Sequence, residues 1–561
     1  MSRLQPRLKA PATSNVSSQS ASATRDPPSK PETSASRPNV RPPSPDSVSD
    51  RVTLFLIRRT LCSQLGEKGR STPVPIDQLL PPLTSSNEVD LQLYAFISII
   101  IREFVQTWYS KITPDQVFVE EVVKIIAHCT RALEQRLRNV DLESLLFDEL
   151  PELLEVHVQA CRASRNCLHP SPAESNPREI YHSLWPYPAL YPVPDGGQNT
   201  LQQMENESAH RQLLVQGVMS VLLPTEDLEN DCLTALAGQI FSEMILGGGI
   251  GGKASEPWLL WEGITKIAEA IQTHLPKSKA EVRIQRSNSD LGGSAQPVLA
   301  GKGTNQWGIG LSLQKMFWLV LQYGFVAFTA VRFFVITFAT ASSLPSRKDP
   351  TTKITGPSST NDPANPDLIN FENSSASRRL PSKQPIVRMK IWSCASALLD
   401  LDARMPWLSA TLSLLQWGTI TGPGKIGDTD GLIDKILSHA IQTHVLEPAL
   451  LPQLLRIARA ALFPNNTLAP ARLVPSPAEQ LLIRRRCAET LLSLIPASAQ
   501  DVYFGGGVER RVQEVEEVLN VFDDSYCNKH LLYGVVELIL VRLLPELAEK
   551  GVEELLEERL S

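Results

Sequence analysis

The sequence predicts an all-α protein, and three observations lead to this fold class. Apolar residues recur at every third or fourth position, as in Leu93, Ile97, Ile100, Phe104 and Trp108, which places them on one face of a helix. Alternating polar and apolar residues, the pattern of a half-buried strand, do not persist over any useful length. The 43 prolines must lie mostly in linkers. We therefore expect two multi-helix regions that pack together, with a hydrophobic, aromatic-rich helix and disordered linkers between them.

Composition narrows the classes of function. Lys and Arg total 54 against 60 Asp and Glu, a net charge of -6, so no positive excess indicates a nucleic-acid partner. The eight cysteines form no Cys-x-x-Cys pair, which excludes common zinc-ribbon spacings and indicates no disulfide framework. We expect reduced, mostly buried thiols in a cytosol-facing protein, and no cofactor.

The N-terminal part of the chain divides into a tail and a helical region. Residues 1–49 are rich in Ser, Pro, Thr and Arg without an apolar stretch, which predicts a disordered tail rather than a secretory signal. Residues 50–275 form the first expected helical region, and Asp50 is its expected first N-cap. Within it, the spacing predicts helices over 52–61, 93–108, 118–137, 142–163, 207–223 and 228–246.

The middle of the chain contains its most hydrophobic segment. Two polar stretches, 276–312 and 343–385, are predicted linkers on either side of a hydrophobic, membrane-associated segment over 313–342. Its central 26 residues carry 8 of the 34 aromatic residues. As a helix they would measure about 39 Å, against about 30 Å of bilayer hydrocarbon. The residues that define this segment are Met316, Trp318, Phe325, Arg332, Phe334 and Ala341.

Arg332 is the one charge in this segment, and it opposes a simple membrane span. A charge near the bilayer midplane costs about 2.5 to 3.5 kcal/mol, although an arginine nearer one end can extend its side chain to the interface. We expect a spanning or re-entrant helix. The alternatives are a helix buried inside the protein and one that lies on the membrane surface.

The second helical region is expected over 386–561. Its spacing again has the helical period, and Glu residues crowd the last predicted turns. The predicted helices cover 387–401, 408–417, 432–444, 449–462, 479–494, 508–522, 526–547 and 546–559.

Sequence motifs in the first region resemble the PXA (phox-associated) domain. The run from Ile99 to Tyr109, IIIREFVQTWY, resembles the opening signature of this domain and is followed by Ile112-Thr-Pro-Asp and Phe118. Its continuation includes Leu153-Leu154 with His157, then Leu222-Leu-Pro224 and Asp227-Leu228.

The second region resembles the sorting-nexin C-terminal (PXC) domain. The resemblance rests on Leu491 to Pro496, on Leu544 to Leu547, and above all on Asn528-Lys-His-Leu-Leu-Tyr533. Leu462-Phe-Pro-Asn-Asn466 stands where that family usually has Trp-Pro-x-Gly, and it departs at Phe463 and Asn466.

The two resemblances imply an endomembrane protein of the larger sorting-nexin type. In that family the PXA and PXC helices are thought to enclose an apolar channel for acyl chains, at endoplasmic reticulum, endosomal or vacuolar membranes and at organelle contacts. This chain differs because neither a PX nor an RGS domain lies between the halves. The hydrophobic segment also lies between them, and not before the PXA region.

The expected function is therefore binding, and transfer, of a phospholipid or fatty acyl ligand at a membrane, without enzymatic activity. Three successive isoleucines beginning at Ile99 cannot all face one core, so some apolar surface needs another partner. A solid helical bundle is the structural alternative. A membrane tether or trafficking scaffold that recruits protein partners at organelle contacts is the functional one. The predicted channel residues are Ile100, Phe104, Trp108, Ile126, Leu222 and Leu532.

Two further motifs do not predict a nucleotide or metal site. Gly247 to Lys253 has the G-x-x-x-x-G-K spacing of a phosphate loop, but Ala254 replaces the hydroxyl residue and no strand precedes it, so a glycine turn is expected. His157, Cys161, Cys167 and His169 follow no known metal-ligand spacing, and we expect buried thiols there.

Overall fold

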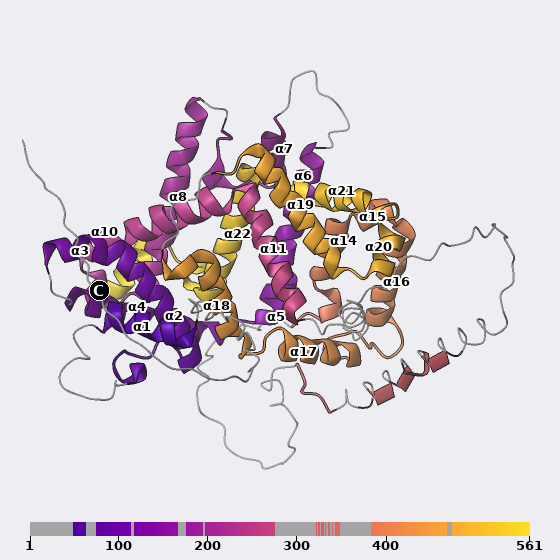
Figure 1. The fold of residues 1–561 in the computed structure, drawn as a ribbon, viewed down its shortest axis with the longest axis horizontal. Helices are drawn as coiled ribbons and strands as arrows, with labels where there is room; N and C mark the ends of the chain where they lie inside the picture. The colour runs from indigo at the N-terminus through magenta and orange to yellow at the C-terminus, as the bar shows by residue number, and fades with distance from the viewer. Residues whose placement is uncertain are drawn as a thin grey trace, which may run out of the picture. The chain divides into compact units, whose positions relative to one another are not determined.

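The computed structural model shows an all-α fold (Figure 1). It describes residues 49–62, 75–113, 117–165, 176–194, 197–274, 383–467 and 474–560, together with part of 321–347, and no strand occurs in these residues. The predicted tail and most of the two predicted linkers lie outside the described residues. The described residues from 49 to 560 belong to one compact unit.

The first helical region follows the predicted spacing closely. Local caps explain several of its boundaries: Asp141 accepts a hydrogen bond from the Ser144 backbone, and Asn176 caps a helix that begins with Pro177. Its elements are α1 (Asp50–Leu61), η1 (Ile76–Gln78), α2 (Asn87–Ile100), η2 (Ile101–Gln106), α3 (Thr107–Ile112), α4 (Val117–Leu137), α5 (Leu142–Ser144), η3 (Leu145–Glu149), α6 (Leu150–Arg165), α7 (Pro177–Leu184), η4 (Pro188–Leu190), α8 (Gln198–Leu222), α9 (Thr225–Leu228), α10 (Asp231–Gln239), η5 (Ile240–Ala254) and α11 (Pro257–His274).

The second region has equally clear boundary signals. Ser476 and Glu479 form a reciprocal capping box at the start of α19, and the Asp524 side chain caps α22. Its elements are η7 (Ile386–Arg388), α14 (Ile391–Leu399), α15 (Leu401–Arg404), α16 (Pro406–Thr421), α17 (Leu432–His444), α18 (Leu450–Leu462), η8 (Pro464–Asn466), α19 (Pro477–Leu494), α20 (Ala497–Tyr503), α21 (Val508–Leu519), η9 (Asn520–Phe522), α22 (Ser525–Leu543), α23 (Glu546–Glu549) and α24 (Val552–Leu560).

Three expectations about secondary structure were wrong. The expected glycine turn over 247–253 is part of η5, a π-helix that runs to Ala254. The helix expected over 526–547 ends at Leu543, because Pro545 cannot continue the hydrogen bonding. The helix expected over 546–559 is two helices, separated at Lys550 and Gly551.

A change of helical period determines which of the three successive isoleucines are buried. Ile99 and Ile101 are buried, whereas Ile100 is 39% exposed. The π-helical stretch η2 begins at Ile101, and its wider turn shifts which side chains face inward. As expected, the three side chains do not share one core.

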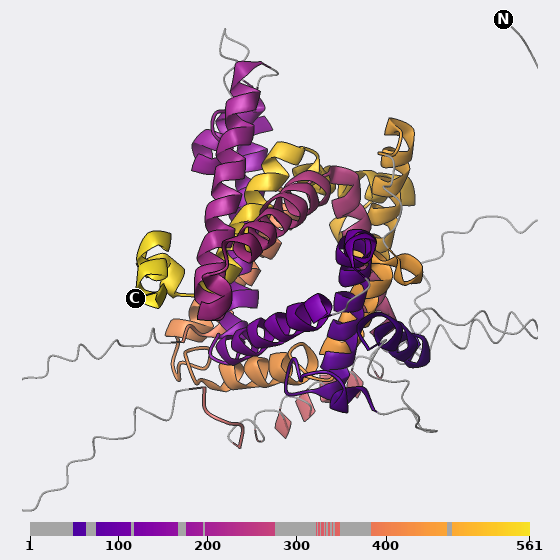
Figure 2. The same ribbon diagram turned by 90° about the vertical axis from the view of Figure 1, so that its left-hand side faces the viewer.

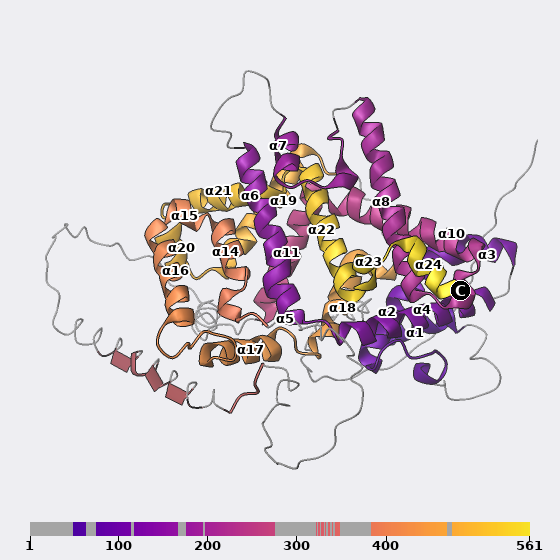
Figure 3. The ribbon, with the colours of Figure 1, turned by 180° about the vertical axis from the view of Figure 1, so that it is seen from behind.

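The two regions pack against each other, as predicted. α22 contacts α4, α6, α7 and η5, while α11 lies on α19 and α2 on α18. Figure 2 shows the yellow C-terminal helices beside magenta helices of the first region, and Figure 3 shows α6 next to α22 from behind. One buried cluster joins Val158 and Tyr181 to Tyr526 and Tyr533, and a second joins Trp261 to α19 and α21.

The hydrophobic segment 313–342 is described only in part. Its described residues from 321 to 339 are helical and exposed, including Phe325 and Arg332, so they are not buried inside the protein. The other residues named for this segment, Met316, Trp318, Phe334 and Ala341, lie outside the described residues. Among the described helices, Asp231–Ala254 is long and apolar enough to cross a membrane, by length and composition alone.

Candidate functional site at the junction of the two helical regions

The N-terminal turns of α22 carry the motif Asn528 to Tyr533 into the first helical region. The Asp524 carboxylate accepts hydrogen bonds from the backbone N–H groups of Tyr526 at 2.8 Å and Cys527 at 3.3 Å. This cap fixes where the helix begins, and therefore which side chains of the following two turns face α6, α7 and η5.

Polar side chains of the motif join α22 to the first region. Asn528 is fully buried, and its Nδ2 donates to the backbone oxygen of Ser255 at 2.9 Å. Lys529 Nζ lies 3.1 Å from a carboxylate oxygen of Glu207, and the Tyr533 hydroxyl donates to the other oxygen at 2.7 Å. The motif that suggested the PXC resemblance thus holds the two regions together.

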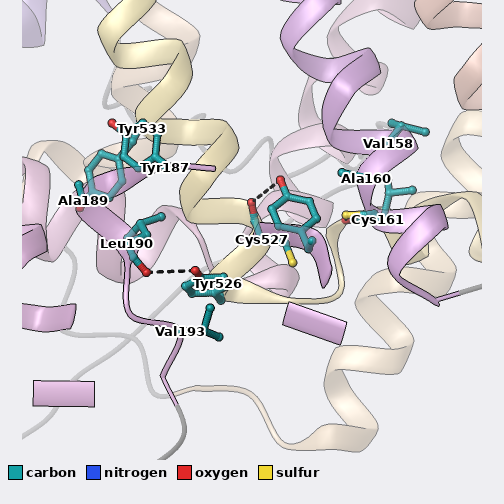
Figure 4. Packing of buried hydrophobic residues seen from close by; sticks show 12 residues of the cluster. Val158, Ala160, Cys161, Tyr187, Ala189, Leu190, Val193, Tyr526, Cys527 and Tyr533 are labelled. Atoms are coloured by element: carbon teal, nitrogen blue, oxygen red, sulfur yellow. Dashed lines mark hydrogen bonds between the residues drawn. The ribbon is translucent and has the colours of Figure 1, made fainter. Parts of the chain in front are cut away.

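His530 occupies the centre of an aromatic cluster. It is fully buried, and its ring centroid lies 5.1 Å from that of Tyr181 and 4.9 Å from that of Tyr526. In the same cluster, Tyr187 stacks on Tyr533, and the Tyr526 hydroxyl donates to the Leu190 backbone (Figure 4). Burial, with smaller contributions from nearby histidines, lowers the pKa of His530 to about 3.

The lowered pKa predicts a pH-dependent stability that depends on His530. An unfolded histidine binds a proton below about pH 6.5, whereas the folded protein keeps this ring neutral, so its stabilising contribution is complete above pH 6.5 and declines as pH falls toward 3. We expect the free energy of unfolding of the wild-type protein to fall by about 1.4 kcal/mol between pH 7.5 and pH 5.5 because of this group. Urea unfolding of His530→Phe at pH 7.5 and pH 5.5 should show a smaller decrease in the free energy of unfolding than wild type does. If both proteins lose the same free energy over this pH range, the assignment to His530 is contradicted.

A second group of charged side chains surrounds Glu207 on α8. Arg211 Nη1 lies 3.1 Å from Glu207, and Arg211 Nη2 donates to Glu243 at 2.9 Å. Burial opposes the charge of Glu207, but Lys529 and the hydrogen bond from Tyr533 lower its pKa. This cluster therefore favours the ionised carboxylate although Glu207 is only 4% exposed.

The helix η5 packs closely on this charged cluster at two glycine positions. A Cβ atom at Gly251 would lie 2.3 Å from the Tyr533 hydroxyl and 2.8 Å from Glu207. At Gly247 it would lie 3.0 Å from the Arg211 guanidinium. The two glycines thus permit a helix–helix approach that a larger residue would prevent.

Arg347 forms a further connection between the regions. Its guanidinium donates to Asp434 at 2.6 Å and to Glu143 at 2.7 Å, and both carboxylates are buried. Burial disfavours the charge, yet the hydrogen bond from Arg347 to Asp434 and the charges of both acids raise its pKa. Residues 343–385 were expected to be a linker, but Arg347 in this stretch is held between α5 and α17.

Many helices of both regions keep large apolar side chains exposed. α16 is the most extreme, because none of its 16 residues is charged and none is buried. Exposed side chains on the described helices include Phe241, Ile267, Trp407, Leu414, Leu415, Trp417, Leu454 and Leu481. This apolar surface has no protein cover in the described part of the chain.

The six predicted channel residues differ in their surroundings. Ile100 and Trp108 are about two-fifths exposed, whereas Leu222 is buried. Phe104, Ile126 and Leu532 are half-buried. The Trp108 indole donates to the backbone oxygen of Phe104 at 2.8 Å, which joins two of the six. Their role in holding lipid stays a prediction.

Within the described residues, no group of three or more His, Cys, Asp or Glu side chains is placed to hold a metal ion. His157 Nδ1 pairs with the Tyr181 hydroxyl at 2.9 Å, and Nε2 pairs with the Val521 backbone oxygen at 3.1 Å. Cys161 is a buried free thiol beside it. Cys167 and His169 lie outside the described residues.

Sequence reasoning missed the junction itself. It treated His530 as part of a family motif, without the aromatic cluster, and it passed over Glu207, Arg211 and Arg347. Buried charged residues on helices look like solvated ones in a sequence, so only their partners far along the chain could have revealed them.

The comparisons with known proteins agree with the first resemblance. Residues 86–267 match the PXA domain family, so this part of the chain is a PXA domain. PXA domain protein 1 of Schizosaccharomyces pombe is 29% identical over 185 residues, which are 32% of this chain and 34% of that protein. Human sorting nexin-25 is 32% identical over 93 residues, 17% of this chain and 11% of that protein.

A longer but more distant similarity covers most of the chain. An uncharacterized protein of Saccharomyces cerevisiae is 20% identical over 459 residues, 81% of this chain and 79% of that protein. The alignments span about a third of PXA domain protein 1 and about a tenth of sorting nexin-25. No solved structure matches. Because the family match ends at residue 267, the PXC resemblance of 386–561 stays a prediction.

Proposed function

We propose that this chain is a non-enzymatic, membrane-associated protein of the endomembrane system that binds phospholipid or fatty acyl chains between its helices. The PXA domain match and the similarity of a 93-residue stretch to sorting nexin-25 support an endomembrane setting. The resemblance of 386–561 to the PXC domain supports a second helical half in the same role.

The observation that carries this proposal is the apolar surface left exposed on both regions. In α16, Trp407 and Leu414 are both 65% exposed, and Trp417 is 64% exposed. Leaving such side chains in water is costly, since burying one large apolar side chain gains about 1.5–3 kcal/mol. Acyl chains match this surface because they are apolar and uncharged, as α16 is.

A second point favours lipid over a protein partner on α16. Tryptophan near both ends of an uncharged helix is the arrangement found where proteins meet membrane interfaces. A protein interface of comparable size usually has a charged or polar rim, and this helix contains only Ser, Thr and one Gln as polar residues.

The proposal predicts that purified full-length protein carries lipid and moves fluorescent phospholipid between liposomes. Leu414→Glu with Leu415→Glu should reduce bound lipid and transfer several-fold, because two exposed apolar positions on α16 become charged. Ser413→Glu, an exposed polar position on the same helix, is the matched control and should have little effect. Native mass spectrometry measures the bound lipid.

Three results would contradict the proposal. These are an empty, well-folded wild-type protein, liposome clustering without transfer, and equal loss in the double variant and the Ser413→Glu control. Clustering without transfer would favour the alternative, a membrane tether or trafficking scaffold with no ligand inside.

A further inference from the structure

A pocket of about 400 Å³ lies beside the junction, where α7, α8, η5 and the start of α22 meet. Its size lies within the usual range of small-ligand sites. The residues that line it include none of the six predicted channel positions. The pocket is therefore a separate feature from the exposed apolar surface.

Both signs of charge line this pocket. Arg178, Arg211 and Lys529 supply positive charge, while Glu207 and Glu243 supply negative charge. Glu207 and Arg211 are only 4% and 7% exposed, so they are fixed in place by their surroundings. A purely anionic ligand would meet two carboxylates here, and a purely cationic one would meet three basic groups. A ligand that carries both charges fits better.

One wall of the pocket is formed by glycine. Gly247, Gly248, Gly251 and Gly252 all line it from η5. They lie within a π-helix, whose backbone N–H groups are used inside the helix, so this wall is not a phosphate-binding loop. Gly247 and Gly251 allow close packing on the charged cluster, whereas Gly248 leaves space beside it.

The edge of the pocket adjoins exposed apolar side chains. Met204 lines the pocket and is 59% exposed, and Leu201, one turn earlier on α8, is 64% exposed. On η5, Met244 is 48% exposed and precedes Gly248 by about one turn. A ligand whose polar end enters the pocket could therefore keep an apolar part against these side chains.

We propose that this pocket binds the phosphate–ammonium headgroup of a zwitterionic phospholipid, of the choline or ethanolamine class. Arg178 and Lys529 would face the phosphate. Glu243 would face the ammonium group, while the Tyr526 ring, which also lines the pocket, has the Arg178 guanidinium 5.9 Å from its centroid. The inference rests on the proposed lipid-binding function and adds the headgroup class.

The glycine wall allows a test that leaves the charged cluster intact. A Cβ atom at Gly248 would meet only the Glu243 backbone oxygen, at 3.5 Å, so Gly248→Leu should fold while filling the pocket. Gly249→Leu is the matched control, because its Cβ would meet only the Met244 backbone oxygen, at 3.6 Å, and Gly249 does not line the pocket. Glu243→Gln is a second variant, since it removes the charge that would face the ammonium group and this side chain is 31% exposed.

In the experiment, the full-length protein is incubated with mixed vesicles of dioleoyl phosphatidylcholine and dioleoyl phosphatidylglycerol. These two lipids have the same acyl chains and differ only in the headgroup. Bound lipid is then measured by mass spectrometry. Wild type and Gly249→Leu should prefer phosphatidylcholine by about tenfold, the discrimination typical of one well-placed charge. Gly248→Leu and Glu243→Gln should lose most of this preference and still bind lipid.

The outcomes separate this inference from the proposed function. Lipid bound by wild type without headgroup preference overturns the pocket assignment alone, as does a preference that survives in Gly248→Leu and Glu243→Gln. No bound lipid of either kind overturns the proposed function. Soluble phosphocholine, added to the free protein, tests the other source of the same chemistry. Binding as tight as that of the vesicle lipid would show a site for a soluble phosphoester and overturn the lipid assignment.

Discussion

Replacing Arg347 by methionine is expected to lower the free energy of unfolding by about 3–5 kcal/mol. The substitution leaves Asp434 and Glu143, which are 0% and 5% exposed, as buried carboxylates without their shared cation. Removing one partner of a buried ion pair costs far more than the pair itself contributes. Denaturant unfolding followed by circular dichroism measures the loss.

A surface arginine provides the comparison. Arg485 also pairs with two carboxylates, Glu489 and Glu509, but all three side chains are substantially exposed. Arg485→Met should change stability far less than Arg347→Met does, because solvent screens an exposed ion pair. Equal effects of the two arginine substitutions would show that Arg347 is not a buried connection. Adding Glu143→Gln and Asp434→Asn to Arg347→Met should recover part of the loss, because neutral amides tolerate burial better than unpaired charges.

The second large effect is expected at Gly251, where even alanine does not fit. Its Cβ would stand 2.3 Å from the Tyr533 hydroxyl, so α22 and η5 must separate or Tyr533 must give up its hydrogen bond to Glu207. Overpacking of this kind costs about 1–3 kcal/mol, and the loss of a buried charged hydrogen bond adds to it. Thermal and denaturant unfolding of Gly251→Ala should show this loss.

Gly249→Ala is its matched control on the same helix. There the Cβ has an ordinary contact of 3.6 Å, and alanine is a better helix former than glycine by about 1 kcal/mol, so stability should hold or rise. Tyr533→Phe in the Gly251→Ala background removes the clashing oxygen and should recover part of the loss. A Gly251→Ala protein as stable as Gly249→Ala would contradict the close approach.

The positions of many helices could be predicted because they depend on the spacing of apolar residues within the helix itself. The period of apolar residues placed α4, α17 and α18 almost to the residue. Helix α7 was not predicted because it has only 8 residues and lies between prolines. Helix α20 was not predicted because it has only 7 residues and lacks a clear apolar face. The prediction of a turn at the glycine run was wrong because glycine usually ends helices, whereas here the run is helical and two of its glycines pack closely on Arg211 and Tyr533.

The site was less predictable because it depends on distant partners. Arg347 lies 204 residues from Glu143 and 87 from Asp434, and nothing near it in the chain distinguishes it from any arginine after an apolar segment. The same holds for Lys529 and Glu207, which are 322 residues apart. Family resemblance indicated the importance of Asn528 to Tyr533, but the partners of these residues required coordinates.

The wide separation of these partners has a consequence for biosynthesis. The His157 ring pairs with the Val521 backbone across 364 residues, and Tyr181 reaches Cys527 across 346. During translation the PXA helices therefore emerge long before the segment that completes their core. Contacts of such separation close slowly, and the nascent chain meanwhile exposes apolar surface to chaperones and to itself. Ribosome-bound chains that stop before α22 should accordingly be protease-sensitive throughout the PXA helices that contact it.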